Sequence, residues 1–107
     1  MFQKNDNSGY QSVLEKIQRK TLVYGEKTLL TEFKLEKGAM LPEHSHPHEQ
    51  TGYLVSGCID LTIGDETYRV DPGGGWCIPG NVAHRARARE DSVAIEVFSP
   101  VREDYIP

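Results

Sequence analysis

Short stretches in which apolar and polar residues alternate, separated by turn-forming residues, follow one another along most of the chain. Between residues 17 and 35, β-branched and aromatic residues stand on both sides of Gly25-Glu26-Lys27, which predicts two strands joined by a turn. The same pattern predicts further strands at 51–55, 58–63, 67–71, 82–90 and 91–100. About eight short strands at regular intervals indicate an all-β barrel or sandwich.

The 107 residues are 37% hydrophobic and 26% charged, a balance typical of a globular protein. Separate hydrophobic cores usually appear only in chains of roughly 250 residues or more, so we expect a single domain over residues 16–107. The polar residues 1–15 are expected to form a loosely held N-terminal arm. A membrane-spanning helix needs about 20 apolar residues, and no run comes close, so we expect no membrane partner.

Charge and cysteine content narrow the partners and the compartment. Twelve basic residues stand against sixteen acidic ones, and the net charge of -4 has the wrong sign for a protein that neutralises phosphates. We therefore expect no nucleic-acid partner. Cys58 and Cys77 are the only thiols and lack the close spacing of a redox or zinc pair, which favours a reducing, cytoplasmic setting.

The stretch from 82 to 90 has two contrasting faces when it is extended. His84, Ala86 and Ala88 fall on one face, and arginines occupy the intervening positions. The arginine face must meet water or acids, so the alanine face is expected to border an interior cavity with room for a ligand. The alternative is that the alanines only accommodate a neighbouring side chain.

The four histidines are concentrated in two places, 44–48 and position 84. His44 and His46 are two residues apart, so on an extended chain both rings project from one face and can share one ion. If Gln50 is also a ligand, the chain must bend before it, and Pro47 is well placed to cause that bend. The sequence thus predicts one divalent transition metal held by His44, His46, Gln50 and His84.

Two details of this prediction stay open at the level of the residues. The imidazoles of a polar loop can instead be simply hydrogen-bonded, without any ion. His48 has the parity of the ligands but stands at the expected bend, so we place it at the rim of the site. Zinc, nickel, iron, cobalt and manganese all accept imidazole and amide ligands in overlapping geometries, so the pattern does not select one of them.

The same residues resemble the two motifs of the cupin family. The first motif matches Gly38, His44, His46, Gln50 and Gly57, and the second matches Gly73, Pro79 and His84. Fifteen residues separate the two motifs, which is the short spacing of compact microbial cupins. The resemblance implies an all-β jelly roll, the RmlC-like double-stranded β-barrel, with the metal inside.

The chain departs from the cupin pattern at three positions. Gln50 stands where many cupins carry glutamate, Asn81 where they carry glycine, and Ala88 where they carry asparagine. The first departure changes the chemistry, because three imidazoles and an amide leave the charge of a divalent ion uncompensated. We therefore expect an anionic ligand to bind well and the ion to favour Lewis-acid chemistry.

Within the cupins, the segments 44–57 and 91–106 resemble the pectin-degradation family KdgF. This resemblance implies conversion of 4,5-unsaturated monouronates, the products of pectin or alginate lyases, into open-chain keto sugars. The family's Asp-x-Phe-x-x-x-Arg run falls on Glu96, Phe98 and Arg102, so these three are the expected catalytic residues. Glutamate replaces the family's aspartate at position 96.

The residues around Glu96 agree with that assignment. Ala94, Glu96 and Phe98 share one face of a strand, which directs Glu96 toward the cavity as a general acid or base. Glu96 paired with a nearby arginine is the alternative. Arg102 is suited to clamp a substrate carboxylate through two parallel hydrogen bonds, unless it is only a solvated arginine near the chain end.

The opposite face of that strand is entirely hydrophobic. It carries Val93, Ile95 and Val97, which we expect to pack against another sheet or a second subunit. Together with the family analogy, this face predicts a homodimer. The overall expectation is a metal-dependent ring-opening or isomerising enzyme acting on a small anionic sugar acid. An iron- or manganese-dependent dioxygenase and a non-catalytic sugar- or metal-binding cupin are the alternatives.

Overall fold

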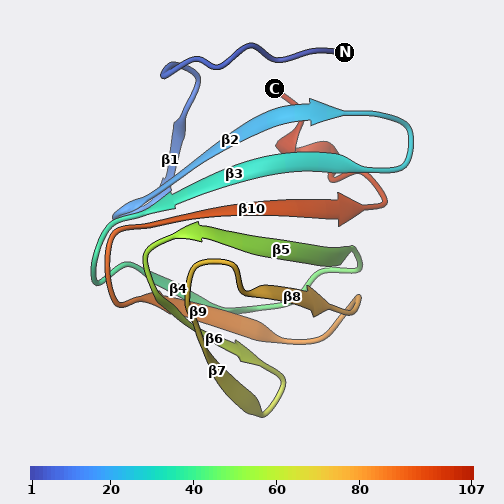
Figure 1. Cartoon of the computed structure of the whole chain (residues 1–107). Coiled ribbons are helices and arrows are strands. Elements are labelled where there is room, and N and C mark those ends of the chain that lie inside the picture. Colours follow the sequence, from blue (N-terminus) through green and yellow to red (C-terminus); the bar gives the residue numbers. More distant parts are fainter.

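The computed structural model describes residues 1–107 and is built almost entirely from β-strands (Figure 1). The strands are β1 (Gln11–Leu14), β2 (Ile17–Tyr24), β3 (Leu29–Leu35), β4 (Met40–His44), β5 (Glu49–Ser56), β6 (Ile59–Ile63), β7 (Glu66–Val70), β8 (Gly75–Ile78), β9 (His84–Ala88) and β10 (Ser92–Ser99). One 3₁₀ turn, η1 (Glu103–Tyr105), follows near the C-terminus. The structure holds no helix with the length and apolar character to cross a membrane.

The strands form two antiparallel sheets. The larger sheet has the order β1-β2-β3-β10-β5-β8 and the smaller one the order β4-β9-β6-β7 (Figure 1). Chain neighbours such as β4 and β5 lie in different sheets, as in a jelly roll. The predicted all-β jelly-roll fold is confirmed, with two facing sheets that do not close into one continuous barrel.

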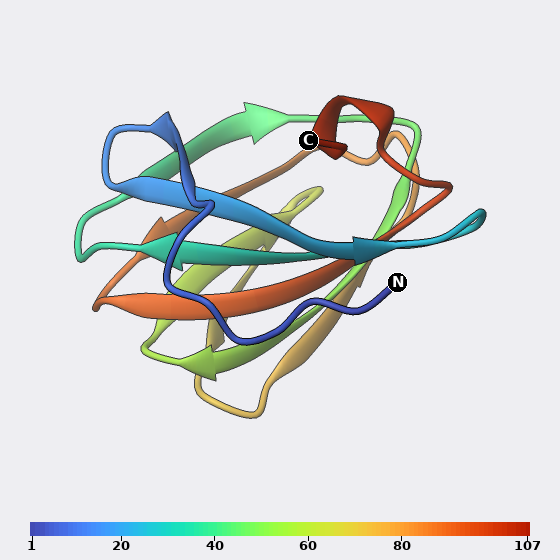
Figure 2. The ribbon, with the colours of Figure 1, turned by 90° about the horizontal axis from the view of Figure 1, so that it is seen from above.

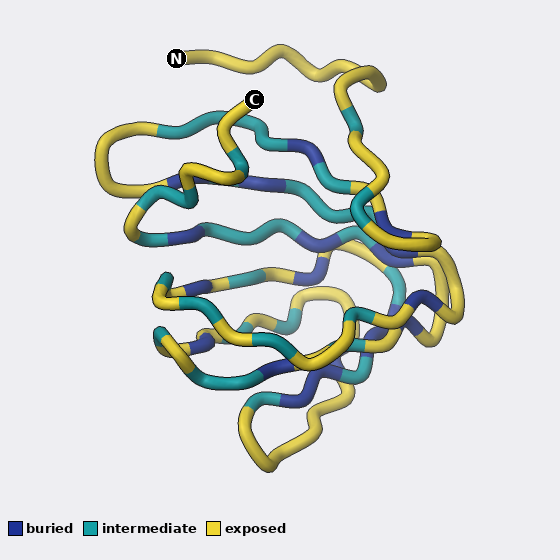
Figure 3. The backbone as a smooth tube through the Cα atoms, turned by 180° about the vertical axis from the view of Figure 1, so that it is seen from behind, coloured by how far each residue is buried: buried dark blue, intermediate teal, exposed yellow.

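The core lies between the two sheets and draws on both. Leu54 of β5 and Ile78 of β8 are fully buried and pack with Leu61 of β6 and Ala88 of β9. Figure 3 shows buried positions along the strands of both sheets, while the terminal arm and most turns are exposed. In β9 the histidine and alanine positions are buried or half-buried and every arginine is exposed, as the alternation predicted.

The structure contains ten strands rather than about eight. Three strands lie outside the predicted ranges, β1, β4 and β8, and all three are edge strands of their sheets. Edge strands have one unpaired edge and tolerate polar residues and proline. Pro42 is therefore compatible with its place in β4. The strand β1 also shows that the stretch expected to be an arm includes residues paired with β2.

The N-terminal arm is tied to the outer surface of the larger sheet. The hydroxyl of Tyr10 donates to the carboxylate of Glu32, and Lys34 lies 4.0 Å from the centre of the Tyr10 ring. The ammonium of Lys20 donates to the backbone oxygen of Asp6 at 2.8 Å. These contacts leave the inner surface of the sheet free to form the site.

Candidate metal centre

Three histidines meet where the two sheets face each other. His44 ends β4 and His84 begins β9, and the two are direct partners in the strand pairing, with ring centres 4.2 Å apart. His46 lies just beyond β4, with its ring centre 5.0 Å from that of His84. One ring nitrogen from each of the three lies within 4.8 Å of the others, which is close enough to hold one ion.

The fourth expected ligand comes from the opposite sheet. The chain bends at Pro47 and His48 and enters β5, which places the buried amide of Gln50 beside the histidines. Gln50 Oε1 lies 3.0 Å from His46 Nε2. The bend is held in place because the backbone nitrogen of Asn81 donates to the backbone oxygen of His46 at 2.7 Å. Asn81 has a φ of 65°, which asparagine tolerates better than most residues, so it can replace the glycine of the cupin pattern.

Hydrogen bonds orient all three rings with the same nitrogen toward the centre. Nδ1 of His44, His46 and His84 lies 2.9, 3.0 and 2.9 Å from the backbone oxygens of Pro42, His48 and Val82, respectively. Since a carbonyl only accepts, each Nδ1 carries the proton and each Nε2 keeps a lone pair for an ion. Burial is the main cause that lowers the pKa of His46 and of His84, which keeps these rings neutral.

Two features of this arrangement fit a bound metal. His84 Nε2 is buried without a hydrogen-bond partner. His46 Nε2 and Gln50 Oε1 lie 3.0 Å apart although both are acceptors in this protonation state, an approach that a shared cation would make favourable. The residues present therefore suit a divalent transition metal. His48 lies outside the three-histidine group, as its place at the bend predicted.

Glu96 of β10 is the one acidic residue that lines the cavity with the histidines. It lies across from Gly52 in the pairing of β10 with β5, and its carboxylate accepts a hydrogen bond from the side-chain nitrogen of Gln50. That bond fixes the amide so that its oxygen faces His46. Burial raises the pKa of Glu96 to about 8, with the charge of Arg102 acting in the opposite direction. A carboxyl group with such a pKa exchanges protons near neutral pH.

Phe98 and Arg102 complete the expected set, and both line the same cavity as His44, His84 and Glu96. Phe98 is fully buried, and its ring centre lies 5.7 Å from that of His46. Arg102 is bound within the chain, because its Nε and Nη2 donate to the carboxylate of Asp104 at 3.2 and 2.8 Å. The N–H groups with which Arg102 could bind a substrate carboxylate are therefore already bound to the carboxylate of Asp104.

The cavity between the sheets has a volume of about 70 Å³. Pockets that enclose small ligands usually measure roughly 300–1,000 Å³, so a sugar-sized ligand requires part of the wall to move. Among the residues that line the cavity, only Arg102 and Tyr105 lie outside the two sheets. Both belong to the segment that follows β10. Figure 2 shows this C-terminal turn, in red, beside the green segment that joins β4 to β5.

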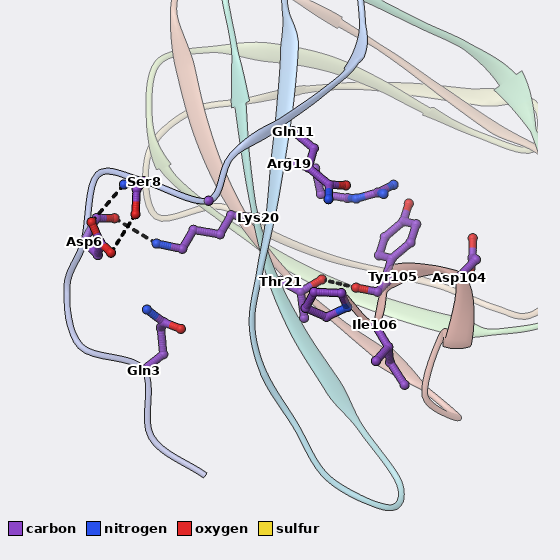
Figure 4. A pocket seen from close by; sticks show the side chains of 12 residues that line it. Gln3, Asp6, Ser8, Gln11, Arg19, Lys20, Thr21, Asp104, Tyr105 and Ile106 are labelled. Carbon is purple, nitrogen blue, oxygen red and sulfur yellow. Dashed lines mark hydrogen bonds between the residues drawn. The ribbon is translucent and has the colours of Figure 1, made fainter.

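Tyr105 is a site residue that the sequence reasoning did not single out. Its ring packs edge-on against Phe98, and its hydroxyl accepts a hydrogen bond from Arg102 at 3.0 Å. Its backbone oxygen accepts from the hydroxyl of Thr21 in β2, and the guanidinium of Arg19 lies 3.8 Å from its ring centre (Figure 4). Tyr105 thus anchors the C-terminal segment to the larger sheet. No spacing rule signalled it, because Thr21 and Arg19, which hold it to β2, lie far away in the sequence.

The two-sheet fold and its internal histidine centre are those of one family of β-proteins. The model of the cupin domain matches residues 31–99, and the chain belongs to the cupin family. Solved structures agree: an RmlC-like cupin from Shewanella frigidimarina has a TM-score of 0.93 at 24% identity and covers 98% of this chain and 95% of its own.

Within the cupins, the chain is similar to KdgF proteins. It is 26% identical to the pectin degradation protein KdgF of Dickeya dadantii over 95% of this chain and 94% of that protein. The structure of KdgF from Halomonas sp. has a TM-score of 0.93 and 33% identity, and the match covers 99% of this chain and 98% of that one. The resemblance stated from the sequence is therefore confirmed.

Proposed function

We propose that this protein is a metal-dependent enzyme that opens or isomerises the ring of 4,5-unsaturated monouronates from pectin or alginate breakdown. One observation carries the proposal: an acid-base carboxyl group, Glu96, is hydrogen-bonded to the amide of Gln50, which faces the three histidines. The similarity to KdgF proteins along nearly the whole chain supports the choice of substrate.

The ligand set suits binding of an anion. Three neutral imidazoles and one amide contribute no negative charge, so a divalent ion held by them would keep its full charge. Such an ion, whether zinc, nickel, iron, cobalt or manganese, supplies Lewis acidity that polarises a substrate oxygen. A small sugar acid carries both the oxygens and the negative charge that this site favours.

The other residues of the cavity have complementary roles. Glu96 moves a proton between substrate atoms during ring opening, which suits its raised pKa of about 8. Arg102 binds the substrate carboxylate after exchanging it for that of Asp104. Phe98 forms a fixed apolar wall between the histidines and Tyr105.

The test uses metal-loaded protein and unsaturated galacturonate, whose conjugated double bond absorbs in the ultraviolet. We expect the protein to accelerate loss of this absorbance, and Glu96→Gln to remove the acceleration while the metal stays bound. Glu90→Gln, at an exposed acid away from the cavity, is the matched control and should act like wild type. The rate of absorbance loss should be the same in the absence of oxygen. If the protein accelerates the reaction of neither unsaturated galacturonate nor the unsaturated alginate-derived sugars, the proposal is refuted.

We also propose that the protein is a cytoplasmic homodimer. Val93, Ile95 and Val97 are half-buried on the face of β10 that points away from the smaller sheet, and Tyr53 of the neighbouring strand is exposed beside them. A second copy covering this face would remove apolar surface from water. Both cysteines are free thiols, which suits a reducing compartment. Light scattering that gives the mass of one chain would refute the dimer.

A further inference from the structure

Trp76 of β8 has a polar group that the fold leaves unused. It is the only tryptophan in the chain, and its indole nitrogen is buried without a hydrogen-bond partner. Buried N–H donors are nearly always partnered, because an unmade hydrogen bond costs the desolvation of the group. Trp76 also lines the cavity that contains His44, His84 and Glu96. An orphaned donor at this place points to a ligand rather than to a structural role.

The strand register directs the indole toward the reacting region. Trp76 is the partner of Gly52 in the pairing of β5 with β8, and Gly52 is the partner of Glu96 in the pairing with β10. A Cβ on Gly52 would lie 2.1 Å from Cε2 of the indole and 2.3 Å from Nε1. The nitrogen edge of the ring therefore lies directly over Gly52, in the same cross-strand row as Glu96.

We infer that Trp76 is a substrate-binding residue whose indole N–H donates to a hydroxyl or ring oxygen of a sugar acid placed beside Glu96. The inference rests on the proposed function for the identity of the ligand. The indole can only donate, whereas the inward-facing Nε2 atoms of the three histidines can only accept or bind metal. The flat ring also offers an apolar surface to the C–H face of a sugar. Trp76 thus adds a donor on the side of the cavity formed by β8 and β5.

The single tryptophan gives a direct test. In the zinc-loaded, ¹⁵N-labelled protein, the indole N–H produces one resonance, which can be followed while galacturonate is added. This saturated sugar acid lacks the double bond of the proposed substrate, so binding is observed without ring opening. We expect the indole proton to shift downfield and saturate together with the binding curve measured by calorimetry. An indole resonance that stays in place at saturating galacturonate, or the absence of any binding, overturns the inference.

Two variants separate the lost hydrogen bond from other effects. Trp76→Phe keeps an aromatic ring but removes the donor, and we expect it to weaken galacturonate binding about tenfold, the range of one hydrogen bond. Tyr53→Phe removes a polar group from the exposed face of the adjacent strand and should leave binding unchanged. Equal affinity of Trp76→Phe and wild type contradicts the inference. If Trp76→Phe does not fold, the shift of the indole resonance in the wild-type protein still tests the inference.

The same experiments distinguish this inference from the proposed function. A moving indole resonance together with no conversion of unsaturated galacturonate would sustain Trp76 as a sugar-acid contact and refute the enzyme. Normal conversion with an unmoved indole resonance would sustain the enzyme and refute the contact.

Discussion

Substitution of Gly52 by alanine tests whether the indole of Trp76 lies across β5. An alanine Cβ would lie 2.1 Å from Cε2, 2.3 Å from Cζ2 and 2.3 Å from Nε1 of the ring, whereas ordinary contact begins at 3.4 Å. All three are atoms of one rigid ring rather than the end of a flexible chain. The ring must therefore shift as a whole, and the space beyond it is the cavity with Glu96.

The expected cost follows from two opposing effects. Overpacking a well-packed interior usually costs about 1–3 kcal/mol. Alanine in a strand recovers about 0.5–1 kcal/mol relative to glycine, because the unfolded chain loses freedom. Contacts this far inside ordinary distance put the overpacking cost at the upper end, about 2–3 kcal/mol, so we expect Gly52→Ala to lower the free energy of unfolding by about 1–2.5 kcal/mol. In a domain of this size, that corresponds to a melting temperature lower by roughly 5–15 °C.

Urea unfolding followed by circular dichroism measures this change, and Gly25→Ala is the control. No atom lies within 4 Å of a Cβ at Gly25, so this variant should be as stable as wild type or slightly more stable. In a Trp76→Ala background, where the ring is absent, Gly52→Ala should no longer destabilise the protein. If Gly52→Ala in the wild-type background stays within about 0.5 kcal/mol of wild type, the indole does not lie over Gly52.

Three further predictions concern the candidate metal centre and the pair formed by Arg102 and Asp104. His84→Ala should abolish stoichiometric zinc binding, measured by elemental analysis after gel filtration, while His48→Ala should retain the metal; equal metal content of the two variants would contradict the ligand set. Adding zinc at about 100 times its dissociation constant should raise the free energy of unfolding by about 2.7 kcal/mol over that of the chelated protein, and an unchanged unfolding curve would argue against a native site. Asp104→Asn should tighten galacturonate binding several-fold in calorimetry, because Arg102 loses its internal carboxylate; unchanged or weaker binding would show that Arg102 does not meet the substrate.

The sequence revealed the parts of the fold that follow from local patterns. The turn between β2 and β3 and the two faces of β9 were predictable, because each depends on residues close together in the chain. The inward direction of Glu96 and Phe98 also followed from alternation along one strand, and both line the cavity. The bend before Gln50 followed from the reach of an extended chain, and it lies at Pro47 and His48.

Other features depend on contacts between distant segments and had no local signal. The place of the Trp76 indole depends on the registers of β5 with β8 and with β10, which alternation along any one strand does not fix. Polar edge strands such as β4 are equally hard to see, since solvent on one side removes the demand for an apolar pattern.

The register of β5 and β10 also brings the side chains of Gln50 and Glu96 into contact. Gln50 Oε1 faces His46, and its side-chain nitrogen donates to Glu96. One amide therefore contacts both the candidate metal centre and the expected acid-base residue. A glutamate at position 50, the usual cupin residue, would place two buried carboxyl groups side by side, and one of them would have to stay protonated. The amide avoids that repulsion and leaves Glu96 as the one carboxyl group that lines the cavity with the histidines.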